Sequence, residues 1–328
     1  MLAVALMTFA LAGPRYTATV TPDHVELADR AAGMSVSIRP SEGDVGFSLK
    51  VNGHEFLWYM PGQMSGIPFV GPWANRLDEQ AFWANGRRYP FDMTLGNVRG
   101  AIPIHGFLTS TNKWRVTEAR ADGASAWATS RLAFSREPAW MKQWPFAHTI
   151  DITYRLQDGA LDVTTAITSL TDEPMPIAIG FHPYFQLTDS SRDDWTISVG
   201  ARTHWKLAQD KVPTGETERI EALFPDPHAV PLRDYDLDDV FSDLERDAKG
   251  RAALSVKGRT QRLDVLFGPN YRAAVVWAPK GRPFVCFEPM AGITDALNLA
   301  QRGVYHELQS VAPGQTWRES FRIIPREF

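Results

Sequence analysis

Hydrophobic and polar residues alternate with a period of two along much of the chain, and turn residues separate the alternating stretches. Residues 34–40 (MSVSIRP) and 45–53 (VGFSLKVNG) alternate on either side of a short polar turn. Residues 148–156 and 160–170 also alternate, and they flank Asp158-Gly159, a pair that is typical of a β-hairpin. Further stretches of this kind, dense in β-branched and aromatic residues, cover 262–268, 272–279, 283–289 and 319–325. The pattern predicts many short antiparallel strands.

Helical periodicity is scarce along the chain. Residues 237–247 (LDDVFSDLERD) favour a short helix, with Asp238 or Asp239 as its N-cap. No Gly/Ser-rich linker, block of like charge or internal repeat divides the sequence. We therefore expect an all-β protein, a large antiparallel β-sandwich with few short helices, in which residues 13–328 form a single domain.

Residues 1–12 differ from the rest because they are almost wholly apolar. Their length suits the hydrophobic region of a signal peptide, and Ala10-Leu11-Ala12 fits the small-residue pattern of a cleavage site. No Lys or Arg lies within residues 1–12, so the usual basic region of a signal peptide is missing. The stretch is too short to span a bilayer. Two interpretations stay open: an exported protein, periplasmic or secreted, with a signal remnant, and a cytoplasmic protein with an apolar N-terminal segment.

The formal charge of the 328 residues is −4, from 34 basic and 38 acidic side chains. No excess of positive charge draws the protein to nucleic acid or anionic membranes, and we expect neither as a partner. Cys286 is the only cysteine, which excludes an intramolecular disulfide and a cysteine-based metal site. Since it lies between Val285 and Phe287, we expect it to be a small buried hydrophobic residue. The sequence leaves the oligomeric state open.

Common catalytic and nucleotide-binding motifs are absent: the chain contains no G-x-S-x-G, G-x-x-x-x-G-K, G-x-G-x-x-G or H-E-x-x-H. Residues 234–245 (DYDLDDVFSDLE) come nearest to a metal site, with Asp at positions 1, 3 and 5 and Glu at position 12 of an EF-hand-like loop. Position 6 is Asp239, where that loop requires glycine. We expect a solvated acidic turn here, no metal site and no cofactor.

Six short motifs occur in a characteristic order; the third, the fourth and the sixth are the specific ones, while the first two are uninformative by themselves. They are ANRL (74–77), IHGF (104–107), GFHPYFQL (180–187), VPTGE (212–216), DDVF (238–241) and VCFEPMAGITDALN (285–298). In this order and spacing, the sequence resembles the aldose 1-epimerase (galactose mutarotase) family, from near residue 20 to the end. The fold of that family is a large β-sandwich, in agreement with the period-two pattern.

The resemblance implies roles for five residues. Glu288 matches the catalytic base of the family, and His182 matches its general acid. His105 matches a second active-site histidine, and Arg76 and Asp238 match residues that bind sugar hydroxyl groups. We therefore expect a sugar as the small-molecule partner.

Three further residues are substrate-binding candidates. Asn75 lies beside Arg76 in the first motif. Trp73 directly precedes the motif that carries Arg76, and Phe107 is the last residue of the motif that carries His105. Both are candidates because aromatic rings can stack on the apolar faces of sugars. Glu307 is a second carboxylate near the C-terminus, which we rank well behind Glu288 as a base.

The chain also departs from the family pattern at three points. It has FHPYF at 181–185 where NHSYF is usual, and FEPM at 287–290 where LETQ is common. Asp239 follows Asp238 where the family often has a histidine. These differences bear on the substrate more than on the reaction.

The chemistry of mutarotation suits these residue types. A base takes the proton of the C1 hydroxyl group, an acid protonates the ring oxygen O5, and the C1–O5 bond opens to an aldehyde that can close on its other face. Two groups with tuned pKa values, on opposite sides of a pyranose, suffice for this, each contributing about 10²–10⁴-fold. Partial burial at the end of an apolar strand would raise the pKa of Glu288 toward neutrality, and an imidazolium at His182 is accessible near pH 7.

The sequence therefore predicts an isomerase, an aldose 1-epimerase that acts on a free aldohexose. Two alternatives stay open. The substrate could be a hexose 6-phosphate, for which Arg87-Arg88 is the nearest basic pair. The protein could also be a carbohydrate-binding sandwich without catalytic activity.

Overall fold

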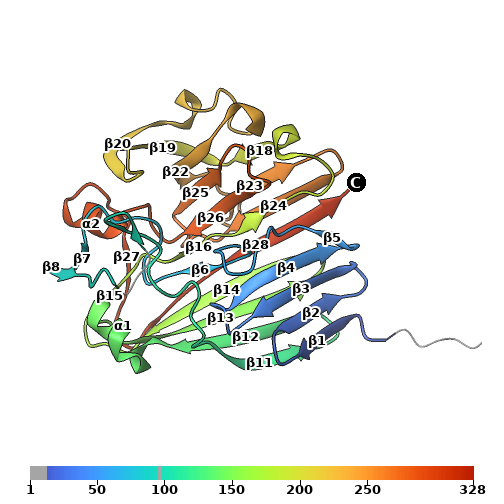
Figure 1. Ribbon diagram of the computed structural model, residues 1–328, viewed down its shortest axis with the longest axis horizontal. Helices are drawn as coiled ribbons and strands as arrows, with labels where there is room; N and C mark the ends of the chain where they lie inside the picture. The colour runs from blue at the N-terminus through green and yellow to red at the C-terminus, as the bar shows by residue number, and fades with distance from the viewer. Residues whose placement is uncertain (1–12, 95–97) are drawn as a thin grey trace, which may run out of the picture.

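The computed structural model describes residues 13–94 and 98–328, so the signal-like segment 1–12 lies outside the described residues. A nine-stranded antiparallel sheet forms one layer of the molecule (Figure 1). In spatial order its strands are β11 (Arg115–Ala121), β12 (Ala126–Ala133), β13 (His148–Gln157), β14 (Ala160–Ser169), β28 (Thr316–Glu327), β24 (Gln261–Phe267), β23 (Ala252–Lys257), β18 (Thr196–Val199) and β21 (Val230–Pro231).

A second large antiparallel sheet has eight strands and carries the candidate site. Its order is β20 (Pro213–Arg219), β19 (Ala201–Leu207), β22 (Leu237–Leu244), β25 (Ala273–Ala278), β26 (Val285–Met290), β16 (Gly180–Phe181) and β6 (Phe69–Val70), and β17 (Tyr184–Phe185) also pairs with β26. The last strand of the chain, β28, therefore lies in the centre of the first sheet, while β26 lies in the centre of the second.

A five-stranded sheet packs against the β11–β13 end of the nine-stranded sheet (Figure 1). It contains β1 (Tyr16–Val20), β2 (Val25–Asp29), β3 (Met34–Arg39), β4 (Val45–Val51) and β5 (His54–Glu55). Three two-stranded sheets are β7 (Ala81–Ala84) with β8 (Arg87–Pro90), β9 (Val98–Arg99) with β10 (Ile102–Pro103), and β15 (Met175–Ile177) with β27 (Gln309–Val311). The helices are short: α1 (Pro138–Gln143), α2 (Ala296–Gln301), and the 3₁₀ turns η1 (Phe134–Arg136), η2 (Arg192–Asp194), η3 (Ile220–Ala222) and η4 (Leu232–Asp234).

The structure confirms the strands predicted from the alternating pattern. Asp158-Gly159 joins β13 to β14, both residues have positive φ (50° and 69°), and the two strands pair over ten residues. Asp and Gly tolerate this left-handed conformation better than other residues, which is why they form such turns.

The prediction of a helix at residues 237–247 is wrong, because Leu237–Leu244 form strand β22. This strand lies between β19 and β25 and pairs with both. The ladder hydrogen bonds and the burial of Leu237, Val240 and Phe241 outweigh a local helical pattern. The acidic turn expected at 234–245 is replaced by the same strand.

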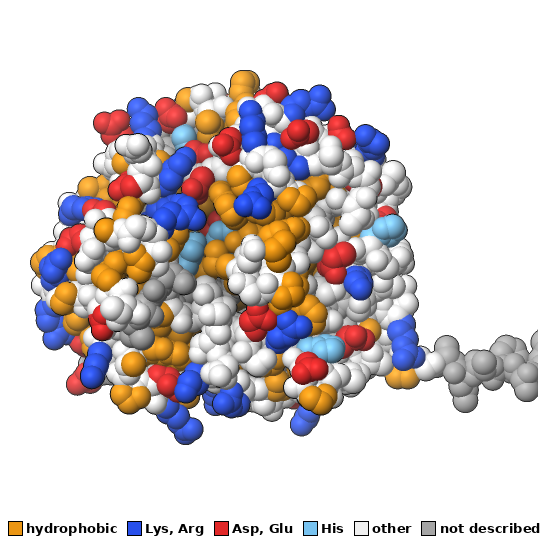
Figure 2. Space-filling model, in the orientation of Figure 1, with side chains coloured by type: hydrophobic (Ala, Val, Ile, Leu, Met, Phe, Trp, Pro, Cys, Tyr) orange, Lys and Arg blue, Asp and Glu red, His pale blue; other side chains and the backbone are white. Residues whose placement is uncertain are grey.

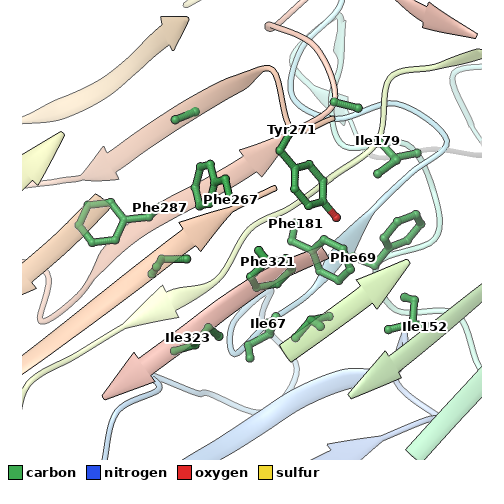
Figure 3. Close-up of a cluster of buried hydrophobic side chains, with 14 of the residues drawn as sticks. Ile67, Phe69, Ile152, Ile179, Phe181, Phe267, Tyr271, Phe287, Phe321 and Ile323 are labelled. Atoms are coloured by element: carbon green, nitrogen blue, oxygen red, sulfur yellow. The ribbon is translucent and has the colours of Figure 1, made fainter. Parts of the chain in front are cut away.

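The main hydrophobic core lies between the large sheets. Figure 3 shows Phe267, Phe287 and Phe321, from strands β24, β26 and β28, in one cluster with the rings of Phe181 and Tyr271. The Phe181 ring lies 4.9 Å from the Phe321 ring, and the Tyr271 ring lies 6.1 Å from it. Phe321 therefore joins the sheet that carries the candidate site to the sheet that supports it.

We predict that Phe321→Ala lowers the free energy of unfolding by about 3–5 kcal/mol, because it opens a cavity in a core that cannot fully collapse around it. Urea denaturation followed by circular dichroism measures this change. Val20→Ala, at a side chain that is 60% exposed, is the control and should stay within about 0.5 kcal/mol of the wild type. A loss under about 1 kcal/mol for Phe321→Ala would contradict the role given to this ring.

Candidate active site

The centre of the eight-stranded sheet has two different faces. Residues directly opposite each other in an antiparallel pair point to the same face, and successive residues alternate between faces. Asp238 lies opposite Trp277, and Glu288 lies opposite Val275. Since Val275 and Trp277 are two residues apart on β25, the side chains of Asp238, Trp277 and Glu288 share one face. The opposite face carries Phe287 into the core between the sheets.

A buried pair of titratable side chains occupies the first face. Oε1 of Glu288 lies 3.2 Å from Nε2 of His182, and the two residues are 1% and 5% exposed. The backbone N–H of His182 donates to the carbonyl of Pro68 (3.0 Å), which holds the residue in place between β16 and β17. Oε2 of Glu288 and Nδ1 of His182 have no hydrogen-bond partner in the described part of the chain. Such buried atoms without a partner are rare in protein interiors.

Burial shifts the pKa values of this pair in opposite directions. Burial raises the pKa of Glu288 well above its usual value, and the charge of Asp238 raises it further, against the lowering effect of Arg76. Burial, together with the charges of Arg76 and Arg99, lowers the pKa of His182 to about 3. Both shifts favour the uncharged form of each partner, so the resting pair is a carboxylic acid beside a neutral imidazole.

Aromatic rings restrict the imidazole of His182. The Tyr184 ring stacks on it at 4.8 Å and 20°, while the Trp277 ring meets it edge-on at 5.5 Å. The His105 ring approaches from another side at 5.2 Å. This packing explains why a histidine lies in the GFHPYF segment: its neighbours remove the water and hold the ring in one orientation.

Arg76 is a buried cation of the site, and its guanidinium group donates to two side chains. Nη1 donates to Oδ1 of Asn75 (3.0 Å), and Nη2 donates to Oδ2 of Asp238 (3.1 Å). Arg76 is 5% exposed, so this ion pair is shielded from bulk solvent. The structure thus brings together the three residues that the sequence assigned to hydroxyl binding, from segments more than 160 positions apart.

Two hydrogen bonds join His105 to Asn75, one of them through the imidazole ring and the other between backbone groups. The N–H of Asn75 donates to Nδ1 of His105 (3.1 Å), and the N–H of His105 donates to the carbonyl of Asn75 (3.0 Å). Because Nδ1 accepts, the ring proton of neutral His105 must lie on Nε2. Gly106 follows with φ of 58°, and a Cβ there would lie 2.0 Å from the carbonyl oxygen of Gly71, so the motif requires glycine.

The DALN motif (295–298) braces the segment that carries Arg76. The N–H of Asp295 donates to the carbonyl of Arg76 (3.0 Å), and Oδ1 of Asp295 accepts from the N–H of Asp78 (3.2 Å). The side-chain amide of Asn298 donates to Asp78 (2.9 Å) and accepts from the N–H of Trp83 (3.2 Å). This motif therefore acts on the site through Arg76.

A cavity of about 570 Å³, a volume within the range of small-molecule sites, is lined by Glu288, His182, His105, Arg76, Asn75 and Asp238. On the face shown in Figure 2, histidine side chains lie in a hollow near the centre, beside a cluster of hydrophobic side chains. Sequence reasoning missed part of the lining: the aromatic residues Trp58, Tyr184, Trp277 and Phe284, and the cations Arg99 and Arg282. Alternation could have found Trp277, since it lies on β25 on the same face as Asp238 and Glu288.

The two residues predicted to stack on a sugar, Trp73 and Phe107, do not line the cavity. Trp73 is only 2% exposed and stacks on Phe91 at 4.5 Å in the core, outside the cavity wall. Phe107 packs edge-on against Trp73 at 5.9 Å and also lies outside that wall. A large aromatic ring gains most where it is fully packed, and the loop after Trp73 turns Arg76 instead toward the cavity.

Other candidates also lie elsewhere. Arg87 and Arg88 are on β8, paired with Glu173 and Glu79, and do not line the cavity. Glu307 is exposed and precedes β27, also outside the cavity wall. Cys286 is fully buried, as predicted, and burial raises the pKa of its thiol.

Among residues 13–94 and 98–328, no group of three or more His, Cys, Asp and Glu side chains could hold a metal ion. No helix in this part of the chain is long and apolar enough to cross a membrane.

The chain belongs to the aldose 1-epimerase family, whose model matches residues 24–323. A galactose mutarotase-like protein from Clostridium acetobutylicum is 20% identical and has a TM-score of 0.82, covering 95% of this chain and 98% of that one. Galactose 1-epimerase from Lactobacillus acidophilus NCFM is 16% identical with a TM-score of 0.75, covering 95% and 98%. An aldose epimerase homologue from C. elegans is 18% identical with a TM-score of 0.72, covering 90% and 96%. At these identities the similarity establishes a galactose mutarotase-like β-sandwich fold.

We predict that His105 stays neutral, with its proton on Nε2, through the pH range in which an ordinary histidine becomes charged. Burial, His182 and Arg76 lower its pKa well below the usual value, and the N–H of Asn75 fixes the tautomer. Nitrogen-15 chemical shifts of labelled imidazoles measure both properties, and the loss of one signal in His105→Gln assigns it. A titration midpoint near the ordinary histidine value, or a proton on Nδ1, would contradict the geometry.

Proposed function

We propose that the protein is an aldose 1-epimerase that interconverts the α and β anomers of a free aldohexose without a cofactor. Glu288 is the base and His182 is the acid. The observation that carries the proposal is the 3.2 Å contact between Glu288 Oε1 and His182 Nε2 at the wall of the cavity. Membership of the aldose 1-epimerase family supports the same reaction class.

The closeness of the acid and the base suits this reaction. The base must reach the hydroxyl oxygen O1 and the acid must reach the ring oxygen O5, and both oxygens are bonded to C1. Two groups in contact can therefore address both atoms of one hemiacetal. Two groups on opposite sides of the pyranose, as the reaction chemistry alone suggests, would not be in contact, whereas Oε1 of Glu288 and Nε2 of His182 lie 3.2 Å apart.

The proton count of the pair stays constant during ring opening. The proton of the resting pair first moves from Glu288 to His182 across their 3.2 Å contact, which gives a carboxylate and an imidazolium. Glu288 then takes the proton of O1 while the imidazolium of His182 gives a proton to O5, and the C1–O5 bond breaks. The pair passes from carboxylate and imidazolium to carboxylic acid and imidazole, which burial favours. The aldehyde then rotates about its bond to C2, and the same two transfers in reverse close the ring on the other face of the carbonyl.

The remaining polar groups hold the sugar. Arg76, Asn75 and Asp238 form a hydrogen-bonded set that can bind neighbouring hydroxyl groups, since a guanidinium group and a carboxylate offer donors and acceptors side by side. Nε2–H of His105 supplies a further donor in the cavity wall. A fixed sugar keeps C1 at the acid–base pair while the open chain rotates.

We predict that the wild type speeds the approach of pure α-D-glucose or α-D-galactose to anomeric equilibrium, and that Glu288→Gln slows kcat by about 10²–10⁴-fold. The amide keeps the shape of the side chain but cannot accept the proton of O1. Polarimetry measures the rate, with Glu307→Gln as the matched control for a glutamate outside the cavity.

The same assay separates the alternatives. Activity in the wild type that survives intact in Glu288→Gln would remove the glutamate from the mechanism. A wild type that binds glucose or galactose but leaves the rate of rotation unchanged would favour the carbohydrate-binding sandwich without catalysis.

A second candidate substrate is a hexose 6-phosphate, because Arg99 and Arg282 line the cavity and neither side chain has an acidic partner among the described residues. An unpaired cation at a cavity wall attracts a phosphate group. These two arginines replace Arg87-Arg88, which are paired with acids elsewhere, as the anion site for this alternative.

If a phosphate group binds there, Arg282→Met should raise KM for glucose 6-phosphate about tenfold and leave KM for glucose unchanged, since only the charged contact is lost. Polarimetry on both sugars measures the difference. Arg87→Met removes a cation outside the cavity and is the matched control. Equal effects of Arg282→Met on both sugars would exclude this alternative.

A further inference from the structure

A histidine on the reverse face of the sheet lies between two carboxylates. His204 of β19 is opposite Glu218 of β20, and its Nδ1 lies 3.0 Å from Glu218 Oε1. Its Nε2 lies 3.0 Å from Oδ1 of Asp239, on β22. The residue is 7% exposed, and its ring packs 5.4 Å from that of Phe241.

This geometry favours a charged imidazole. A neutral ring has one N–H and can donate to only one of the two carboxylates, while an imidazolium donates to both. Burial lowers the pKa of His204, but the hydrogen bonds to Asp239 and Glu218 outweigh burial and raise that pKa above the usual value. Both carboxylates and the ring therefore act as one charged unit.

The unit connects to the candidate site through the backbone of β22. The second oxygen of Asp239, Oδ2, accepts a hydrogen bond from the N–H of Asp238 (3.1 Å). The side chain of Asp238 points to the opposite face of the sheet, where its Oδ2 binds Nη2 of Arg76 (3.1 Å). A continuous set of contacts thus runs from Glu218 through His204 and Asp239 to the ion pair in the cavity.

We propose that His204 is a positioning residue for the sugar-binding ion pair of Asp238 and Arg76. It holds the carboxylate of Asp239, which fixes the peptide N–H of Asp238 and so the direction of the Asp238 side chain. This inference rests on the proposed function, in which that ion pair binds hydroxyl groups. His204 lies on the face away from Glu288 and His182, and its side chain bonds to Glu218 and Asp239 and to neither group of the acid–base pair.

His204→Phe removes both N–H donors and keeps an aromatic ring of similar shape. We expect KM for the sugar to rise about tenfold while kcat stays within about twofold of the wild type, because the acid–base pair is unchanged. His228→Phe is the matched control, since His228 is a surface histidine in an ion pair with Glu245. Thermal unfolding followed by circular dichroism checks that each variant is folded.

Asp239→Asn is the conservative variant. Its amide oxygen can still accept from the N–H of Asp238, and its NH₂ group can donate to a neutral His204 whose Nδ1–H donates to Glu218. We expect KM within about twofold of the wild type for this change. Asp239→Ala removes the same link and should raise KM as His204→Phe does, which keeps the test available if the phenylalanine variant does not fold.

The outcomes separate this inference from the proposed function. The positioning role would be overturned if KM were unchanged in His204→Phe and Asp239→Ala. It would also be overturned if kcat fell by the same factor by which KM rose. Crystal structures of these variants decide the case even if the wild type has no epimerase activity, which would overturn the proposed function alone. A displaced Asp238 carboxylate supports the inference, and an intact contact with Arg76 overturns it.

Discussion

The alternation of side chains across three central strands, β22, β25 and β26, is the constraint on which the rest of this structure depends. One face of these strands carries Phe241, Val276 and Phe287 into the core, and the other carries the polar residues of the cavity. A shift of one residue in the pairing of β26 would move Glu288 into the core and Phe287 into the cavity. The hydrophobic core therefore fixes the register of the site.

Burial of the acid–base pair follows from this arrangement, and it has a cost. Glu288 and His182 lie where water is excluded by Tyr184 and Trp277, so neither group is easily charged in the resting protein. A buried ion pair is stabilised only when further hydrogen bonds satisfy both partners. One atom of each partner has no such hydrogen bond in the described part of the chain, so the charged form of the pair lacks that stabilisation. The packing of the large sheets offsets the free-energy cost of burying Glu288 and His182.

The polar residues around the pair depend on loops that are braced from behind. Asp295 and Asn298 hold the segment after Arg76, His105 and Asn75 hold each other, and His204 lies behind Asp238 on the other face of the sheet. Loops alone would leave these side chains with many conformations. Each brace removes conformational freedom before a ligand arrives, which is the physical meaning of a preorganised site.

Much of the fold and part of the site could be predicted from the sequence. The strands at 34–40, 148–170 and 283–289 follow from local alternation and turn chemistry, because both are properties of short stretches of chain. Glu288, His182 and Arg76 could be named because the motifs around them resemble those of the aldose 1-epimerase family in order and spacing. Local pattern failed at 237–247, where central pairing overrode a helical signal, and at Trp73, whose ring enters the core.

The sequence by itself determined the all-β class, its hairpins, and the residue types that could perform acid–base chemistry on a sugar. Only the tertiary structure decided that Glu288 touches His182, that Arg99 and Arg282 line the cavity in place of Arg87-Arg88, and that His204 lies behind Asp238. These contacts join residues far apart in the chain. They depend on which strands pair and in which register, and packing of the whole core sets both.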